Sequence, residues 1–457
     1  MKTVDVTPSD AVVRYWSNAA PDEQRVRFGS DARLDCGGAV NLLSRHLPVV
    51  AADLLDFAAS VYAIDRMVPR PRYRGYDNGQ DWAREIRAEF PVREPDRWTQ
   101  AKGELHALLE WLTDDHWECS FVRSAGNGLS SGQGYLMGVL PGGIEPVLFS
   151  GGLDSSAGLA VHSRTRPLLP VSVVTNNHMA GVQREVLRRL PEGADESLHV
   201  RFKINLKRSL TGPSGTSESS QRARGLVFLA VGTATALTLG TERLWFCENG
   251  IGAVNLPYIR SQLGAQATRS AHPRTTAAME ALLGKLTGKS FKIHNPFIGM
   301  TKAEVLSAVP PDSVDAVAAS VSCDTSFATR VKGHPRCGVC TSCLLRRQAV
   351  IASRYPRLDE HLVYRKDASA STRQLVAMLW QASRMSVCLD VDAPWQALIN
   401  EFPQLVDAMQ FVSPDALTSM FVTYTREWPS FIDSLGLRVG DWFGDRRQHA
   451  NDGCHSG

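Results

Sequence analysis

The stretch Val147-Leu-Phe-Ser-Gly-Gly-Leu-Asp-Ser-Ser156 decides the fold. Its apolar start predicts a buried strand, and a helix is expected to open at about Asp154. Two glycines, Gly151 and Gly152, allow the backbone to approach an anion closely. The N–H groups of the new helix would then point at that anion, with the helix dipole behind them. The stretch therefore predicts a phosphate-binding turn between a strand and a helix.

Polar side chains add to this turn. The hydroxyls of Ser150, Ser155 and Ser156 are candidate donors to a phosphate. Asp154 would repel a bare phosphate, so its presence suggests either a bridging Mg²⁺ or an N-cap role. The alternative for the whole stretch is a glycine-rich turn that Asp and Ser cap without any ligand.

The residues that follow alternate between strand and helix patterns. We predict strands at 146–149, 168–175, 199–204 and 243–247, and helices at 156–163, 182–190 and 225–239. Such alternation is typical of a parallel sheet with helices on both faces.

We expect three regions along the chain. An N-terminal accessory region of α+β type spans 1–143, an α/β domain spans 144–355, and a helical region spans 356–457. The Ser- and Gly-rich segment between Arg208 and Arg224 is either a flexible linker or a lid over the active site.

The composition excludes several classes of protein. The chain has 457 residues, a hydrophobic fraction of 43% and a formal net charge of +3. So small a surplus of positive charge argues against a protein that wraps long stretches of nucleic acid. It leaves only a local basic groove as a possible nucleic-acid site. The N-terminus has no apolar signal segment, and no run approaches the roughly 18 apolar residues of a membrane span. We therefore expect a cytoplasmic protein without a membrane partner.

Four of the nine cysteines crowd into one segment. Cys337, Cys340 and Cys343 form a C-x₂-C-x₂-C motif, and Cys323 lies upstream with thirteen residues between it and Cys337. Four thiolates suit tetrahedral Zn²⁺, and a filled site of four cysteines is structural because it keeps no open position. An iron–sulfur cluster is the alternative. The remaining cysteines are expected to be small buried hydrophobic residues, namely Cys36, Cys119, Cys247, Cys388 and Cys454.

These two motifs together resemble a known family. Ser150, Gly151, Gly152, Asp154 and Ser155 match the SGGxDS loop of the N-type ATP pyrophosphatases, the PP-loop enzymes, which release pyrophosphate during adenylation. With the cysteines and the Leu-Leu-Arg-Arg-Gln run after them, the chain is similar to the 7-cyano-7-deazaguanine synthase (QueC-like) family. The resemblance covers roughly residues 146–352.

The resemblance implies a fold, a chemistry and a set of site residues. It implies an adenine-nucleotide α-hydrolase-like sheet, ATP with Mg²⁺, and a structural zinc held by Cys323, Cys337, Cys340 and Cys343. Asp154 and Ser155 would be catalytic, and Glu248, Asn249 and Lys302 would contact the substrate. ATP would lie against Phe149, Ser150, Gly151, Gly152, Leu153, Asp154, Ser155, Ser156 and Arg224.

The implied reaction is adenylation of a carboxylate, that of 7-carboxy-7-deazaguanine, followed by attack of ammonia or of a protein amine. The family's Tyr-Pro-Asp-Cys substrate element has only a partial counterpart at Leu256-Pro257-Tyr258. Longer QueC-like proteins with added terminal regions resemble components of bacterial anti-phage operons, the Qat and type IV CBASS groups. The added regions therefore predict protein partners from the same operon. A tRNA-thiolating PP-loop enzyme and a nucleotide-binding scaffold of a defence complex are the alternatives.

Overall fold

The computed structural model describes thirteen stretches of the chain. They are residues 12–17, 20–27, 31–35, 47–70, 83–124, 140–174, 177–191, 198–206, 218, 220–258, 268–324, 336–369 and 371–443. Cys36, Cys454 and most of the predicted linker or lid segment lie outside the described residues.

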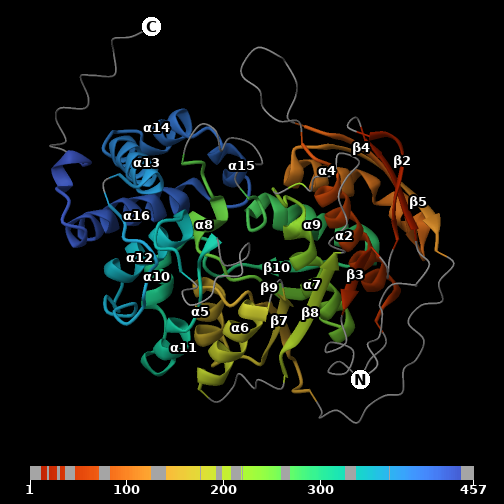
Figure 1. The fold of residues 1–457 in the computed structure, drawn as a ribbon, viewed down its shortest axis with the longest axis horizontal. Coiled ribbons are helices and arrows are strands. Elements are labelled where there is room, and N and C mark those ends of the chain that lie inside the picture. The colour runs from red at the N-terminus through yellow and green to blue at the C-terminus, as the bar shows by residue number, and fades with distance from the viewer. Residues whose placement is uncertain are drawn as a thin grey trace, which may run out of the picture.

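Six strands form the larger sheet, in the order β10-β9-β6-β7-β8-β3 (Figure 1). They are β3 (Ala32–Asp35), β6 (Glu145–Leu148), β7 (Leu168–Val174), β8 (Val200–Leu206), β9 (Arg243–Trp245) and β10 (Lys292–His294). All neighbours pair in parallel except β3, which pairs antiparallel with β8. β7 is buried along its whole length, as expected for a central parallel strand covered on both faces. The predicted parallel α/β sheet is confirmed.

Helices cover both faces of this sheet. Successive side chains of a strand point to opposite faces, so the apolar residues of one strand enter two separate cores. Val147 of β6 joins one hydrophobic core and Leu148 joins the other. The core of Val147 contains side chains of α5 (Leu153–His162) and α6 (Asn177–Arg189). The other core contains α2 (Val49–Met67), α7 (Arg224–Leu239) and α9 (Pro273–Thr287). Shorter helices are α8 (Gly250–Val254), α10 (Lys302–Ser307), η4 (Pro311–Ser313), α11 (Val314–Ala318) and α12 (Thr341–Ala352).

A second, four-stranded sheet lies in the N-terminal region, in the order β2-β1-β4-β5. Its elements are β1 (Val12–Ser17), β2 (Ala20–Arg27), β4 (Glu85–Val92), α3 (Pro95–Gln100), α4 (Lys102–Thr113) and β5 (His116–Arg123). α2 connects the two sheets: its Phe57 ring lies 4.6 Å from Phe90 of β4, and the helix packs on α7 (Figure 1). The hydrophobic core therefore crosses the predicted boundary near residue 143.

A buried ion network fastens this N-terminal region to the start of α7. Arg84 is fully buried, and its guanidinium donates to Asp65 and to Asp115 at 2.6 Å each. Arg70 forms a second ion pair with Asp115 at 2.7 Å. The carboxylate of Asp65 also accepts the backbone N–H of Ala223 at 3.0 Å. Since an unpaired buried charge is costly, these groups fix where α7 begins.

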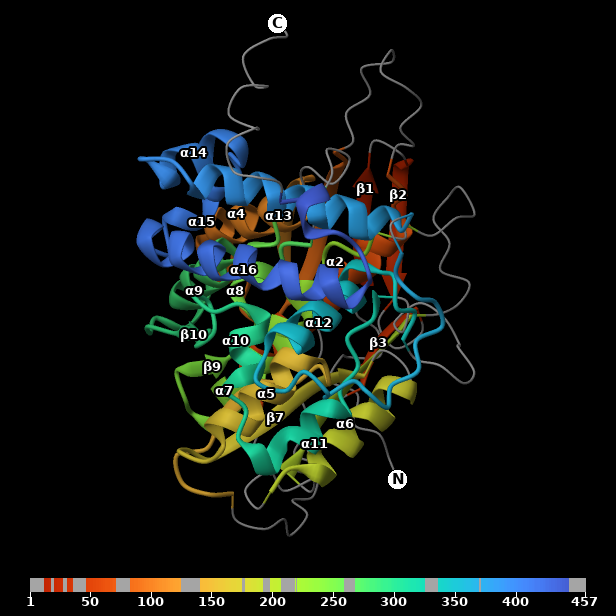
Figure 2. The same ribbon diagram turned by 90° about the vertical axis from the view of Figure 1, so that its left-hand side faces the viewer.

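The C-terminal region is helical, as predicted. It contains α13 (Arg373–Leu389), α14 (Pro394–Glu401), α15 (Leu405–Met409), α16 (Pro414–Ser434) and the short η6 (Val439–Asp441). Figure 2 shows α16 lying along α12 and α8. One hydrophobic core contains residues of all three helices, so the C-terminal region packs directly on the α/β domain.

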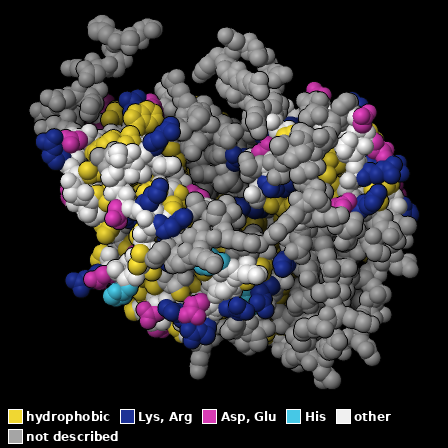
Figure 3. Space-filling view, viewed as in Figure 1, with side chains coloured by type: hydrophobic (Ala, Val, Ile, Leu, Met, Phe, Trp, Pro, Cys, Tyr) yellow, Lys and Arg dark blue, Asp and Glu magenta, His cyan; other side chains and the backbone are white. Residues whose placement is uncertain are grey.

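The described surface carries both signs of charge. Figure 3 shows basic and acidic side chains interspersed on the face of Figure 1, in keeping with the net charge of +3. Within the described stretches, no helix has the length and apolarity needed to cross a bilayer.

Candidate nucleotide site and metal centre

The turn between β6 and α5 is built around two glycines. Gly151 has φ +83°, a left-handed conformation that favours glycine, and a Cβ there would lie 3.1 Å from Cγ of Gln183. The backbone N–H of Gly152 donates to the Ser150 hydroxyl at 3.2 Å. The backbone therefore turns sharply at the end of the strand, and α5 begins directly after it at Leu153.

The serines of this turn take two different roles. The hydroxyls of Ser150 and Ser155 lie 3.1 Å apart. Ser156 is fully buried and donates to the carbonyl of Gly152 at 2.8 Å, so it stabilises the first turn of α5. The side chains of Phe149 and Leu153 belong to the hydrophobic core, so only their backbone atoms could reach a ligand.

Four predicted residues come together beside the turn. Asp154 accepts a hydrogen bond from the Asn249 amide at 2.9 Å, and its other oxygen pairs with the ammonium of Lys302. The same Asn249 nitrogen donates to Glu248 at 2.9 Å, while its oxygen accepts the N–H of Gly252 at the start of α8. Lys302 offsets the charge of Asp154, and this pairing explains how a carboxylate can lie beside the predicted phosphate site.

Glu248 is the titrating group of this cluster. Burial and, to a smaller extent, the charge of Asp154 raise its pKa to about 8 against the opposing effect of Lys302. Near neutral pH the folded protein therefore favours the protonated carboxyl, which can donate a hydrogen bond.

The raised pKa of Glu248 predicts how stability depends on pH. The folded state holds the proton on Glu248 more tightly than the unfolded state does. The contribution of this group to the free energy of unfolding is therefore fully present below about pH 4.5 and is lost as pH rises toward 8. Glu248→Gln should therefore match the wild type in melting temperature at pH 5 and exceed it at pH 9. Thermal melts of both proteins test this, with exposed Glu118→Gln as the control. Parallel pH curves for wild type and Glu248→Gln would contradict it.

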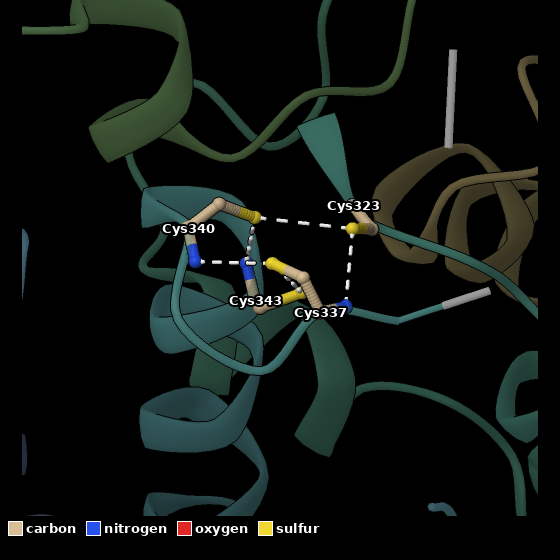
Figure 4. Close-up of side chains that lie close together, drawn as sticks. All are labelled: Cys323, Cys337, Cys340 and Cys343. Atoms are coloured by element: carbon tan, nitrogen blue, oxygen red, sulfur yellow. Dashed lines mark hydrogen bonds between the residues drawn. The ribbon is translucent and has the colours of Figure 1, made fainter. Parts of the chain in front are cut away.

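Four cysteine sulfurs converge at the start of α12 (Figure 4). The sulfurs of Cys323, Cys337, Cys340 and Cys343 all lie within 4.8 Å of one another. The pairs Cys337–Cys343 and Cys340–Cys323 are separated by 3.9 and 4.0 Å. Tetrahedral zinc with bonds of about 2.3 Å requires sulfur separations of roughly 3.8 Å, so the cluster fits the ion.

Backbone groups around the cluster fit bound thiolates as well. The N–H groups of Cys337, Cys340 and Cys343 point at neighbouring sulfurs at 3.3–3.4 Å. The neighbouring Cys323 thiol and burial raise the pKa of the Cys343 thiol. A bound cation would stabilise the thiolates that these donors face. Among the other described cysteines, Cys119, Cys247 and Cys388 are buried as predicted.

Comparisons with known proteins match the part of the chain that contains both groups of residues. The family model for "Queuosine biosynthesis protein QueC" matches residues 146–354. Residues 146–354 form a QueC-family domain. The family predicted from the phosphate loop and the cysteines is confirmed, and with it the prediction of an enzyme.

Individual relatives match over the same part of the chain. The 7-cyano-7-deazaguanine synthase of Saccharophagus degradans is 28% identical over 215 residues, which are 44% of this chain and 90% of that protein. The enzyme of Methylococcus capsulatus is also 28% identical, with 91% of its length covered. That of Cupriavidus necator is 27% identical over 225 residues and 93% of its length. The QueC-family domain therefore accounts for nearly the whole of these relatives and for under half of this chain.

One residue beside the phosphate loop of the QueC-family domain was not predicted. The hydroxyl of Ser322 accepts the backbone N–H of Leu153 at 3.1 Å, and the N–H of Val321 donates to the carbonyl of Gly151 at 3.0 Å. Ser322 directly precedes the metal-site residue Cys323. The cysteine cluster thus holds a segment that supports the loop, and only the proximity to Cys323 in sequence could have indicated it.

Arg346, the first arginine of the Leu-Leu-Arg-Arg-Gln run, has a structural role in the QueC-family domain. It is fully buried, pairs with Asp359 at 2.9 Å and donates to the carbonyl of Ser320 at 2.9 Å. It therefore anchors the same segment from the other side.

Arg224 is the predicted ATP contact that lies farthest along the chain from the loop. It is the first residue of α7. Its positive charge opposes the rise that burial causes in the pKa of the Tyr62 hydroxyl in α2. Its role toward ATP stays a prediction.

Proposed function

We propose that this chain is an ATP-dependent enzyme of the 7-cyano-7-deazaguanine synthase type that adenylates a carboxylate. The observation that supports it most is the turn at Ser150–Gly152, where the start of α5, two serine hydroxyls and the paired Asp154 lie together. This arrangement suits the pyrophosphate part of ATP.

The proposed step breaks the bond between the α- and β-phosphates of ATP. A carboxylate oxygen of the substrate attacks the α-phosphorus, pyrophosphate leaves, and an acyl-adenylate forms. The loop N–H groups and the hydroxyls of Ser150 and Ser155 would stabilise the charge that develops on the leaving group. Mg²⁺ bound with ATP would neutralise further phosphate charge, and the carboxylate of Asp154 would be the group that holds it.

We propose a deazapurine acid, 7-carboxy-7-deazaguanine, as the substrate. The names of the relatives motivate this choice, since an activated acid and ammonia give an amide at the 7-position, and activation of that amide by a second ATP allows loss of water to the nitrile. Glu248 and Asn249 would face the base, and the protonated carboxyl of Glu248 could donate to a ring carbonyl.

The final acceptor is either ammonia or an amine of a protein partner. A protein acceptor would fit an anti-phage role, because more than half of this chain lies outside the QueC-family domain. In that case the product is a deazapurine amide on the partner protein.

Mass spectrometry of the full chain with ATP and 7-carboxy-7-deazaguanine tests the proposal. We expect consumption of the acid with ammonium or with proteins encoded beside this gene, and a product that forms only when ATP is present. A mass corresponding to the nitrile supports ammonia, and a conjugated protein mass supports the protein amine. An acid that stays unchanged with every acceptor would contradict the proposed substrate.

A further inference from the structure

The C-terminal helices contact the walls of the candidate site. Gln381 of α13 donates to the carbonyls of Leu256 and Pro257 at 3.3 and 2.9 Å. These carbonyls belong to the segment that partly matches the family's substrate element. At the start of α8, a Cβ on Gly250 would lie 2.2 Å from the sulfur of Met420 in α16. The region outside the QueC-family domain therefore packs against the site itself.

One acidic side chain of α16 reaches α10 and α12 together. Glu427 accepts a hydrogen bond from the hydroxyl of Thr301 through one oxygen and from the amide of Gln348, at 2.8 Å, through the other. Thr301 and Gln348 are both fully buried. Both oxygens of Glu427 are therefore used, and they join two elements of the QueC-family domain.

Thr301 is the N-cap of the helix that carries Lys302. Its hydroxyl accepts the N–H of Glu304 at 3.1 Å, and the Glu304 side chain accepts the N–H of Thr301 at 2.8 Å. This is a capping box, and it fixes the direction in which α10 begins. Since the Thr301 hydroxyl donates to Glu427, both of its hydrogen-bonding functions are engaged.

We propose that Glu427 is a positioning residue of the active site. It holds Thr301, the capped start of α10 holds the backbone of Lys302, and Lys302 pairs with Asp154 beside the phosphate loop. The C-terminal region thereby completes a site that lies in the QueC-family domain. The expected effect of Glu427 on the reaction rate rests on the proposed function. Its expected effect on the position of Lys302 rests on the geometry alone.

The first test measures pyrophosphate release by Glu427→Ala. We expect kcat to fall roughly 10–100-fold with a much smaller change in the KM for ATP, because a displaced catalytic group costs rate out of proportion to its distance. Glu401→Ala, which removes a carboxylate from the exposed Arg384 pair in the same region, should keep the wild-type rate. Glu427→Gln keeps the volume and one acceptor, so it should lose less.

A double-mutant cycle separates positioning from general damage. Thr301→Val removes the hydroxyl that donates to Glu427. If Glu427 acts through Thr301, the double variant should be about as slow as the slower single variant. Multiplied losses would contradict this route.

The second test does not depend on activity. Competitive labelling of lysine amines, read by mass spectrometry of the full chain, should show Lys302 protected in the wild type because it is buried and paired. In Glu427→Ala the labelling of Lys302 should rise several-fold, and in Glu427→Gln it should rise less, while that of exposed Lys285 stays constant. Unchanged labelling of Lys302 would overturn the inference. Absence of pyrophosphate release from the wild type would instead count against the proposed function.

Discussion

Asp154→Asn should lower the rate of pyrophosphate release by a factor of roughly 10²–10³. The substitution keeps the shape of the side chain and an acceptor for the Asn249 amide, but it removes the charge that pairs with Lys302. Lys302 then loses its fixed position, and any Mg²⁺ held with ATP loses a carboxylate. Loss of one contact made in the transition state typically costs about 2.7–4 kcal/mol.

Two further variants are measured beside Asp154→Asn. Ser155→Ala should also lower the rate steeply, because it removes a hydroxyl from the loop. Asp312→Asn is the control: it breaks an exposed pair with Arg164 and should leave the rate unchanged. Steady-state rates at saturating ATP measure the effect, and thermal melts show that each variant is folded. A wild-type rate in Asp154→Asn would remove Asp154 from the chemistry.

Cys340→Ser should have the largest effect on stability. Structural zinc sites in zinc-finger peptides bind with about 10–16 kcal/mol of apparent free energy, and losing a ligand forfeits much of it. In this chain the cysteine cluster also holds the segment of Ser322, which supports the phosphate loop. We therefore expect Cys340→Ser to aggregate or to melt far below the wild type.

The matched control is Cys388→Ser, which changes a buried cysteine of α13 outside the cluster. It should bind as much metal as the wild type. Elemental analysis of the wild type should find about one zinc per chain. Stoichiometric iron and sulfide would contradict the zinc prediction and would favour the tRNA-thiolating alternative.

Sequence predicted the parts of the site that are local. The turn at Ser150–Gly152 and the C-x₂-C-x₂-C motif each place their ligands within a few residues, so short patterns suffice. The contact between Asp154 and Lys302 joins residues 148 positions apart, and no local pattern encodes it. Ser322 and Glu427 were missed for the same reason, because each acts through an element distant in sequence.

Element types were easier to predict than their limits and partners. The α6 helix begins at Asn177 instead of near residue 182, since its first turn is largely polar and buries only Met179. The short β3 was not expected in the larger sheet, because it lies in the N-terminal region and pairs with a distant strand, Leu34 opposite Ile204. Both errors arise where tertiary packing, and not periodicity, decides.

The most direct test of the central claim is the identity of the nucleotide products. Phosphorus-31 NMR of the wild-type reaction with ATP, Mg²⁺ and the deazapurine acid should show AMP and pyrophosphate, because adenylation breaks the bond between the α- and β-phosphates. The same signals should be absent from Asp154→Asn over the same period. ADP and orthophosphate as the primary products would contradict adenylation, whatever substrate the enzyme accepts.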